Sequence, residues 1–117
     1  MQTSLKTQKK QVEVPKRIFH HIKGKYPGAT IVFFAGIHGN EFAGVDALNN
    51  VLKKLNEEDI TGEIYGVYGN IKALQKNKRF LESDLNRLWT QNQLNAIQHK
   101  KKLNQEEQEQ KELFYFI

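Results

Sequence analysis

Residues 30–41, Thr-Ile-Val-Phe-Phe-Ala-Gly-Ile-His-Gly-Asn-Glu, decide the fold of this chain. The first six are almost wholly apolar and rich in β-branched and aromatic side chains. This composition predicts a strand buried on both faces, as in the middle of a parallel sheet. The glycines at Gly36 and Gly39 then end the strand. A helix is expected to begin near Asn40.

Downstream, the sequence predicts a helix and then a second strand. Residues 62–70, Gly-Glu-Ile-Tyr-Gly-Val-Tyr-Gly-Asn, predict the strand. Strand, helix and strand form a βαβ unit, so the expected fold class is α/β, with helices flanking a mostly parallel or mixed sheet. The helix is indicated by apolar residues at three- and four-residue steps, namely Phe42, Val45, Leu48, Leu52 and Leu55.

The flanking segments give weaker patterns. Residues 1–14 are polar and are expected to be disordered or loosely ordered, and residues 17–22 predict a strand. A loop with at most one turn of helix is expected over 71–86, and a poorly amphipathic helix is indicated by Leu88, Leu94 and Ile97. Residues 98–112 are a low-complexity run of Gln, Glu, Lys and Asn, which predicts a solvated polar helix. Because chain ends usually lie in water, the apolar residues 113–117 suggest that the chain is the amino-terminal part of one longer, truncated domain.

Composition excludes several classes of function. The 117 residues suffice for one domain. Cysteine is absent, which excludes disulfides and thiolate chemistry. No apolar run is long enough for a membrane span or a signal peptide, so a cytoplasmic protein is expected. The net charge of +5 fits either a solvated surface or a nucleic-acid patch. Because the lysines are spread along the chain, the solvated surface is favoured.

His38 and Glu41 form the first motif with chemical potential. They lie where the strand hands over to the helix, and the carboxyl end of a strand is where sites form in open parallel sheets. Residues three apart at a helix start share a face, so both side chains could reach one zinc ion, which accepts imidazole and carboxylate ligands. Alternatively, His38 is a loop residue and Glu41 a first-turn acid favoured by the helix dipole. Spacing alone favours this structural interpretation.

The second motif lies in the loop after the second strand, over residues 69–74 and 79–87. Its arginines, Arg79 and Arg87, and the intervening Asn86 would suit an acidic substrate, because guanidinium binds carboxylate through two parallel hydrogen bonds. The alternative is that both arginines are surface charges paired with nearby acids. This motif alone does not decide between the two.

Taken together, the motifs resemble the zinc-dependent succinylglutamate desuccinylase and aspartoacylase family, a branch of the carboxypeptidase-like metalloenzymes. The resemblance covers residues 30–87. It implies that His38 and Glu41 bind Zn²⁺, that Arg79 polarises the scissile carbonyl, and that Asn86 and Arg87 hold the substrate carboxylate. The implied reaction is hydrolysis of an N-acyl amino acid amide by zinc-activated water. Asp84 fits the motif as well, in a structural or outer-shell place.

The family's third zinc ligand, a histidine, and its glutamate general base have no counterpart in this chain. His99 lies in the polar run, and His20 and His21 precede the site, so none of the three matches the missing ligand. The chain is therefore expected to be the amino-terminal part of a catalytic domain, inactive by itself. Its expected partner is a small acyl amino acid, with no nucleic acid and no membrane. The rival hypothesis is a non-catalytic basic module that binds anionic ligands or nucleic acid.

Overall fold

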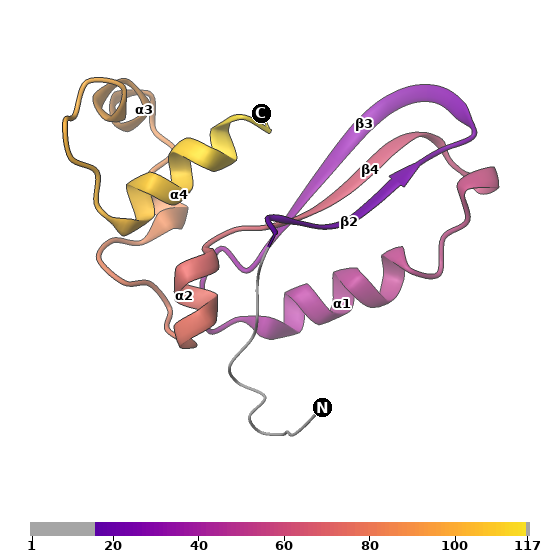
Figure 1. Ribbon diagram of the computed structural model, residues 1–117, viewed down its shortest axis with the longest axis horizontal. Helices are drawn as coiled ribbons and strands as arrows, with labels where there is room; N and C mark the ends of the chain where they lie inside the picture. Colours follow the sequence, from indigo (N-terminus) through magenta and orange to yellow (C-terminus); the bar gives the residue numbers. More distant parts are fainter. Residues whose placement is uncertain (1–15, 117) are drawn as a thin grey trace.

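A computed structural model describes residues 16–116 and shows a three-stranded mixed sheet with helices around it (Figure 1). The strands are β2 (Ile18–Lys23), β3 (Tyr26–Ala35) and β4 (Thr61–Tyr68), in the order β2-β4-β3. β4 is antiparallel to β2 and parallel to β3. The α/β class and the three predicted strands are confirmed. The expectation for residues 1–14 falls outside the described part of the chain.

Helix α1 (Phe42–Leu52) connects the parallel strands β3 and β4 and completes the predicted βαβ unit. Val45 and Leu52 are buried on its inner face. The helix packs closely over the sheet, because a Cβ placed on Gly66 of β4 would lie 3.1 Å from a Leu52 methyl group. The three- and four-residue apolar spacing therefore predicted the inner face of α1, but Leu55, the last residue of the pattern, lies beyond the helix and is exposed.

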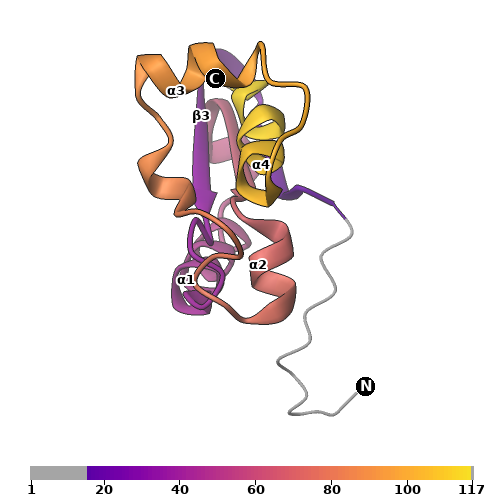
Figure 2. The same ribbon diagram turned by 90° about the vertical axis from the view of Figure 1, so that its left-hand side faces the viewer.

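The opposite face of the sheet packs against the second half of the chain. Val67 of β4, Leu85 and Leu113 form a buried cluster there, and Val32 and Phe34 of β3 pack against it. Figures 1 and 2 show α2, α3 and α4 gathered at the end of the molecule to which β3 and β4 lead. The remaining elements are the 3-10 helices η2 (Glu57–Asp59) and η3 (Leu85–Arg87) and the helices α2 (Ile71–Lys76), α3 (Gln91–Ile97) and α4 (Gln105–Phe114).

Strand β3 differs from its predicted environment. It was expected to be buried on both faces, but it lies at an edge of the described sheet, next to β4 alone. Ile31 and Phe33, on the α1 side, remain 49% and 42% exposed. Within the described residues, 16–116, the prediction that β3 is buried on both faces is therefore wrong. An apolar run indicates a tendency towards burial, but it does not show which other element covers the strand.

Helix α4 departs furthest from the sequence pattern. Residues 98–104 lie outside any helix, and α4 begins at Gln105, where Asn104 and Glu107 form a reciprocal capping box. Glu106, Glu107, Glu109 and Gln110 are buried, so the expectation of a solvated helix is wrong. The carboxylates of the three glutamates have partners within the protein, which permits their burial, and the Gln110 side-chain amide donates to the carbonyl of Leu88 while its Oε1 has no partner. For example, the Arg17 guanidinium pairs with Glu109 and also donates to the carbonyls of Tyr68 and Gly69, at 2.9 and 2.6 Å. None of the described helices has the length and apolar content to cross a bilayer.

Candidate functional site

The first motif forms the loop between β3 and α1, and two glycines determine its path. Gly36 has φ +76°, a left-handed conformation that favours glycine. A Cβ on Gly39 would lie 2.2 Å from the carbonyl carbon of Ala73 in α2, so only glycine allows this close approach. The Gly39 N–H also donates to the carbonyl of Arg79 at 3.1 Å. The loop that holds His38 is therefore tied to the start of the second motif's arginine segment.

The ends of the two parallel strands lie side by side. The N–H groups of Gly69 and Asn70, just after β4, donate to the carbonyls of Ala35 and Gly36, each at 2.8 Å. The buried Asn70 side chain also accepts a hydrogen bond from Ala73 N at 3.3 Å and so caps α2. Both motifs consequently start from the same carboxyl edge of the sheet, as expected for a site in an open parallel sheet.

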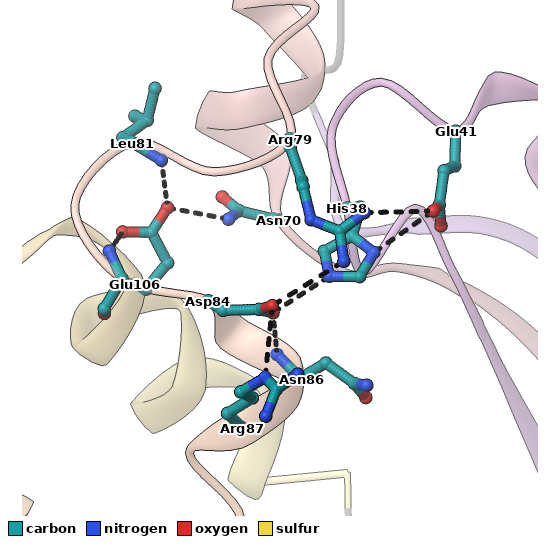
Figure 3. Close-up of polar contacts among 10 residues, drawn as sticks. His38, Glu41, Asn70, Arg79, Leu81, Asp84, Asn86, Arg87 and Glu106 are labelled. Atoms are coloured by element: carbon teal, nitrogen blue, oxygen red, sulfur yellow. Dashed lines mark hydrogen bonds and ion pairs between the residues drawn. The ribbon is translucent and has the colours of Figure 1, made fainter.

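His38 lies between two carboxylates (Figure 3). Its Nδ1 is 3.2 Å from Oε2 of Glu41, and its Nε2 is 2.9 Å from Oδ1 of Asp84. The histidine is only 8% exposed, whereas the Glu41 side chain is 56% exposed. Glu41 occupies the N-cap position of α1 but makes no capping hydrogen bond. Its carboxylate therefore faces His38 and solvent at the amino end of α1, a position that also suits an acid favoured by the helix dipole.

Asp84 is the hub of the second motif. Besides His38, its carboxylate accepts the N–H of Asn86 at 3.0 Å, which caps η3. Burial raises the pKa of Asp84, but the hydrogen bonds from His38 and Asn86 and the positive charge of Arg79 outweigh it, so the pKa lies below its usual value. Asp84 is thus an anion that holds both the imidazole and the loop.

The two arginines lie near Asp84, but at distances longer than a hydrogen bond. Arg79 Nη1 is 3.9 Å from Glu41 Oε2, and its Nη2 is 3.8 Å from Asp84 Oδ2. Arg87 Nε is 3.7 Å from Asp84 Oδ2. These long contacts leave the side chains of Arg79 and Arg87 53% and 83% exposed, and Asn86 is exposed as well. The sequence-predicted residues therefore come together at one place, with the arginine donors open to an anionic ligand.

Two buried residues at this edge escaped the sequence analysis. Asn70 lies within the second motif, but its spacing gave no sign of a role. Glu106 of α4 is fully buried and receives a hydrogen bond from Asn70 Nδ2 at 2.9 Å. Glu106 lies in a run of Gln and Glu residues, and the amino-acid composition of this run does not distinguish a buried glutamate from its exposed neighbours.

The other histidines have separate surroundings. His21 of β2 is 2.8 Å from Glu63 and stacks on the ring of Tyr65 at 4.2 Å between centroids. His99 is exposed after α3. Across residues 16–116 there is no cluster of three or more His, Cys, Asp or Glu side chains arranged to hold a metal ion.

The fold and the site define a class: an α/β protein with a histidine–carboxylate pair and two arginines at the carboxyl edge of its sheet. The family model described as the succinylglutamate desuccinylase/aspartoacylase catalytic domain matches residues 27–116. The chain belongs to this family, as the two motifs predicted.

Several curated relatives are named succinylglutamate desuccinylase. The protein from Ectopseudomonas mendocina is 38% identical over 64 residues, which are 53% of this chain and 19% of that protein. The one from Photorhabdus laumondii is 37% identical over 68 residues, or 56% and 21% of the two chains. The Serratia proteamaculans protein is 41% identical over 61 residues, or 50% and 19%. The matched region thus spans about a fifth of these relatives. No solved structure matches the chain significantly.

Proposed function

We propose that this chain provides the His-Glu zinc pair and the arginines of a zinc-dependent hydrolase that deacylates an N-acyl amino acid. The observation that carries the proposal is His38 facing Glu41 at 3.2 Å, with Asp84 behind it and Arg79 beside it. The relatives named succinylglutamate desuccinylase make N-succinylglutamate the first substrate to test.

The donor set fits zinc. Asp84 accepts a hydrogen bond from Nε2–H, which leaves the lone pair of a neutral His38 at Nδ1, directed at Glu41. Two acceptors at 3.2 Å need a proton or a cation between them. The separation is close to the value of about 3.4 Å that bonds of 2.0–2.2 Å in tetrahedral geometry imply. A zinc-ligating histidine usually donates a hydrogen bond from its other ring N–H to a carboxylate, and His38 has this arrangement.

Each remaining residue then has a defined part in the reaction. When bound, zinc supplies a Lewis acid and activates water at neutral pH. Arg79 donates hydrogen bonds to the substrate carbonyl oxygen as negative charge develops on it. Asn86 and Arg87 bind the carboxylate of the amino acid, where a planar guanidinium gives two parallel bonds. Asp84 keeps the His38 proton on Nε2 and does not touch the substrate.

Calorimetric zinc titration tests the metal pair. We expect one weak site per chain, abolished by His38→Ala and by Glu41→Gln. His99→Ala and His21→Ala are matched controls, because these histidines lie outside the site, and both variants should bind zinc as the wild type does. Zinc binding that survives His38→Ala would show that the ligands are elsewhere and would overturn the proposal.

A further inference from the structure

Glu106 is a buried carboxylate that receives three consecutive backbone N–H groups from one loop. Leu81 N donates to Oε2 at 2.7 Å (Figure 3). Glu82 N and Ser83 N donate to Oε1 at 2.9 and 3.0 Å. Asn70 Nδ2 adds a fourth hydrogen bond at 2.9 Å. Four donors match the roughly four lone-pair positions of a carboxylate. The loop therefore closes around the end of this side chain.

The position of this loop in the chain makes the contact functionally relevant. Residues 81–83 lie between Arg79 and Asp84, within a segment that belongs to neither a helix nor a strand. The Glu106 carboxylate therefore accepts the backbone N–H groups that would otherwise be paired within a helix or a sheet. Further contacts act in the same direction, since Gln105 N donates to Glu82 Oε2 at 2.7 Å and Asn104 Nδ2 to Ser83 Oγ at 3.3 Å.

A helix-stabilising acid would explain a glutamate in the first turn of α4, but this explanation suits its neighbour. Glu107 closes the capping box by accepting the N–H of Asn104 at 2.9 Å, and it pairs with Lys100 at 2.7 Å. The oxygens of Glu106 instead accept hydrogen bonds from the 81–83 loop and Asn70. Two adjacent buried acids of one helix therefore have different structural roles. Glu107 caps the amino end of α4, whereas Glu106 binds the backbone of the 81–83 loop.

We propose that Glu106 is a positioning residue that fixes the conformation of loop 79–87 and so sets the affinity of its arginines for a carboxylate ligand. The affinity part rests on the proposed function. The link is geometric: Asn70 ties Glu106 to the edge of the sheet beside the His38 loop, and the three N–H groups tie it to the arginine loop. Removal of the carboxylate leaves three aligned donors without an acceptor, and the loop then samples other conformations.

The first measurement is amide hydrogen exchange by NMR on the 117-residue chain without ligand. In Glu106→Gln, where an amide group replaces one carboxylate oxygen by a donor, the N–H groups of residues 81–83 should exchange about tenfold faster or more. Glu107→Gln is the matched control, because it removes an equally buried acid from the same helix; there the 81–83 amides should keep their protection. Exchange at wild-type rates in Glu106→Gln would overturn the proposal.

A rescue experiment separates positioning from general loss of stability. Glu106→Ala removes a fragment that acetate replaces atom for atom. Added acetate should restore protection of the 81–83 amides in this variant, whereas chloride at equal ionic strength should not. Glu106→Asp, which keeps the charge on a shorter side chain, should retain part of the protection. Failure of both acetate and aspartate to restore any protection would contradict the role of the carboxylate.

The second measurement is affinity for succinate, a dicarboxylate probe, by NMR titration. Glu106→Gln should weaken binding by about three- to tenfold, since only the fraction of molecules with an ordered loop can bind, and Glu107→Gln should not. Unchanged affinity in Glu106→Gln would overturn the proposal's affinity part. Arg87→Ala tests the proposed function separately: if it binds succinate as the wild type does, the carboxylate clamp is wrong, while the exchange result still decides the role of Glu106.

Discussion

At the scale of single residues, Asp84 organises the site. It joins the buried imidazole of His38 to the loop that holds both arginines, and its low pKa keeps it charged. A neutral group of the same shape would lose the strong acceptor for Nε2–H of His38 and with it the preference for a lone pair at Nδ1. Metal affinity should therefore depend on a residue that binds no metal.

Asp84→Asn is expected to lower zinc affinity by about 10- to 100-fold, the usual effect of losing such an outer partner. Calorimetry on the wild type and the variant gives the ratio directly. Asp46→Asn is a suitable control, because Asp46 is an exposed acid of α1 with no contact to His38, and its substitution should leave zinc affinity unchanged. Equal affinities for Asp84→Asn and the wild type would mean that the Asp84 contact does not tune His38.

At the scale of elements, the crossover from β3 through α1 to β4 places both loops at one edge, and close packing then locks them together. Gly39 lies against the backbone of α2, and the Ala35 and Gly36 carbonyls accept hydrogen bonds from the chain that leaves β4. The site thus depends on contacts between loops as well as on the regular elements that deliver them.

Gly39→Ala should destabilise the fold by about 1–3 kcal/mol, because the added methyl would overlap backbone atoms that cannot move aside cheaply. Its Cβ would lie 2.4 Å from the carbonyl oxygens of both Ala73 and Lys78. Gly44→Ala in α1 is the matched control: no atom lies within 4 Å of its Cβ, so it should stabilise the helix by about 0.5–1 kcal/mol. Urea unfolding of the three proteins measures both changes. A Gly39→Ala protein as stable as the wild type would contradict the packing argument.

The buried acids of α4 should make the fold sensitive to acid. Burial raises the pKa of Glu106, but the hydrogen bonds from the loop and Asn70 outweigh it, and for Glu107 those from Lys100, Asn104 and Gln93 do the same; both values lie below the usual 4.5. The folded state then binds fewer protons than the unfolded state, so the stabilisation is complete above the usual value and is lost as the pH falls below it.

Urea unfolding between about pH 7 and pH 3 tests this directly. The wild type should be more stable than Glu106→Gln at neutral pH, and the difference should shrink below the usual glutamate pKa, because a protonated Glu106 resembles glutamine. A difference in unfolding free energy that stays constant over this range would show that Glu106 does not titrate with folding.

At the scale of the whole molecule, the candidate site lies at one edge of the sheet and is open to solvent. Residues 16–116 contain no group of three metal ligands, and the side chains of Glu41 and Arg79 are more than half exposed. The proposed pair of ligands, His38 and Glu41, would therefore bind a metal ion weakly and would leave it open to water. At least one of the many lysines has a structural role, since Lys100 forms an ion pair with the buried Glu107.

The 117-residue chain alone should therefore release succinate from N-succinylglutamate at a negligible rate, at least about 10²-fold below an enzyme that has its general base. Succinate release with and without a chelator measures this. Clear turnover that the chelator abolishes would show that the chain is catalytically complete. Salt-sensitive binding to a DNA or RNA duplex, unchanged in His38→Ala, would instead favour the basic binding module.

The sequence by itself determined the βαβ unit and the residues that meet at its edge. Runs of β-branched and aromatic residues predicted the strands, and apolar periodicity predicted α1. The two motifs identified His38, Glu41 and the arginine loop, because all these signals depend on residues close together in the chain. The zinc-carboxypeptidase-like architecture and the zinc and substrate roles remain predictions.

Only the tertiary structure decided which polar groups are partners. Asp84 lies 46 residues from His38, and Glu106 lies 36 residues from Asn70. Hydropathy predicted that the acids of α4 face water, and this failed because a carboxylate can be buried wherever another segment supplies its donors. No local pattern contains that information: the Leu81–Ser83 amides that satisfy Glu106 reach it only when the chain has folded.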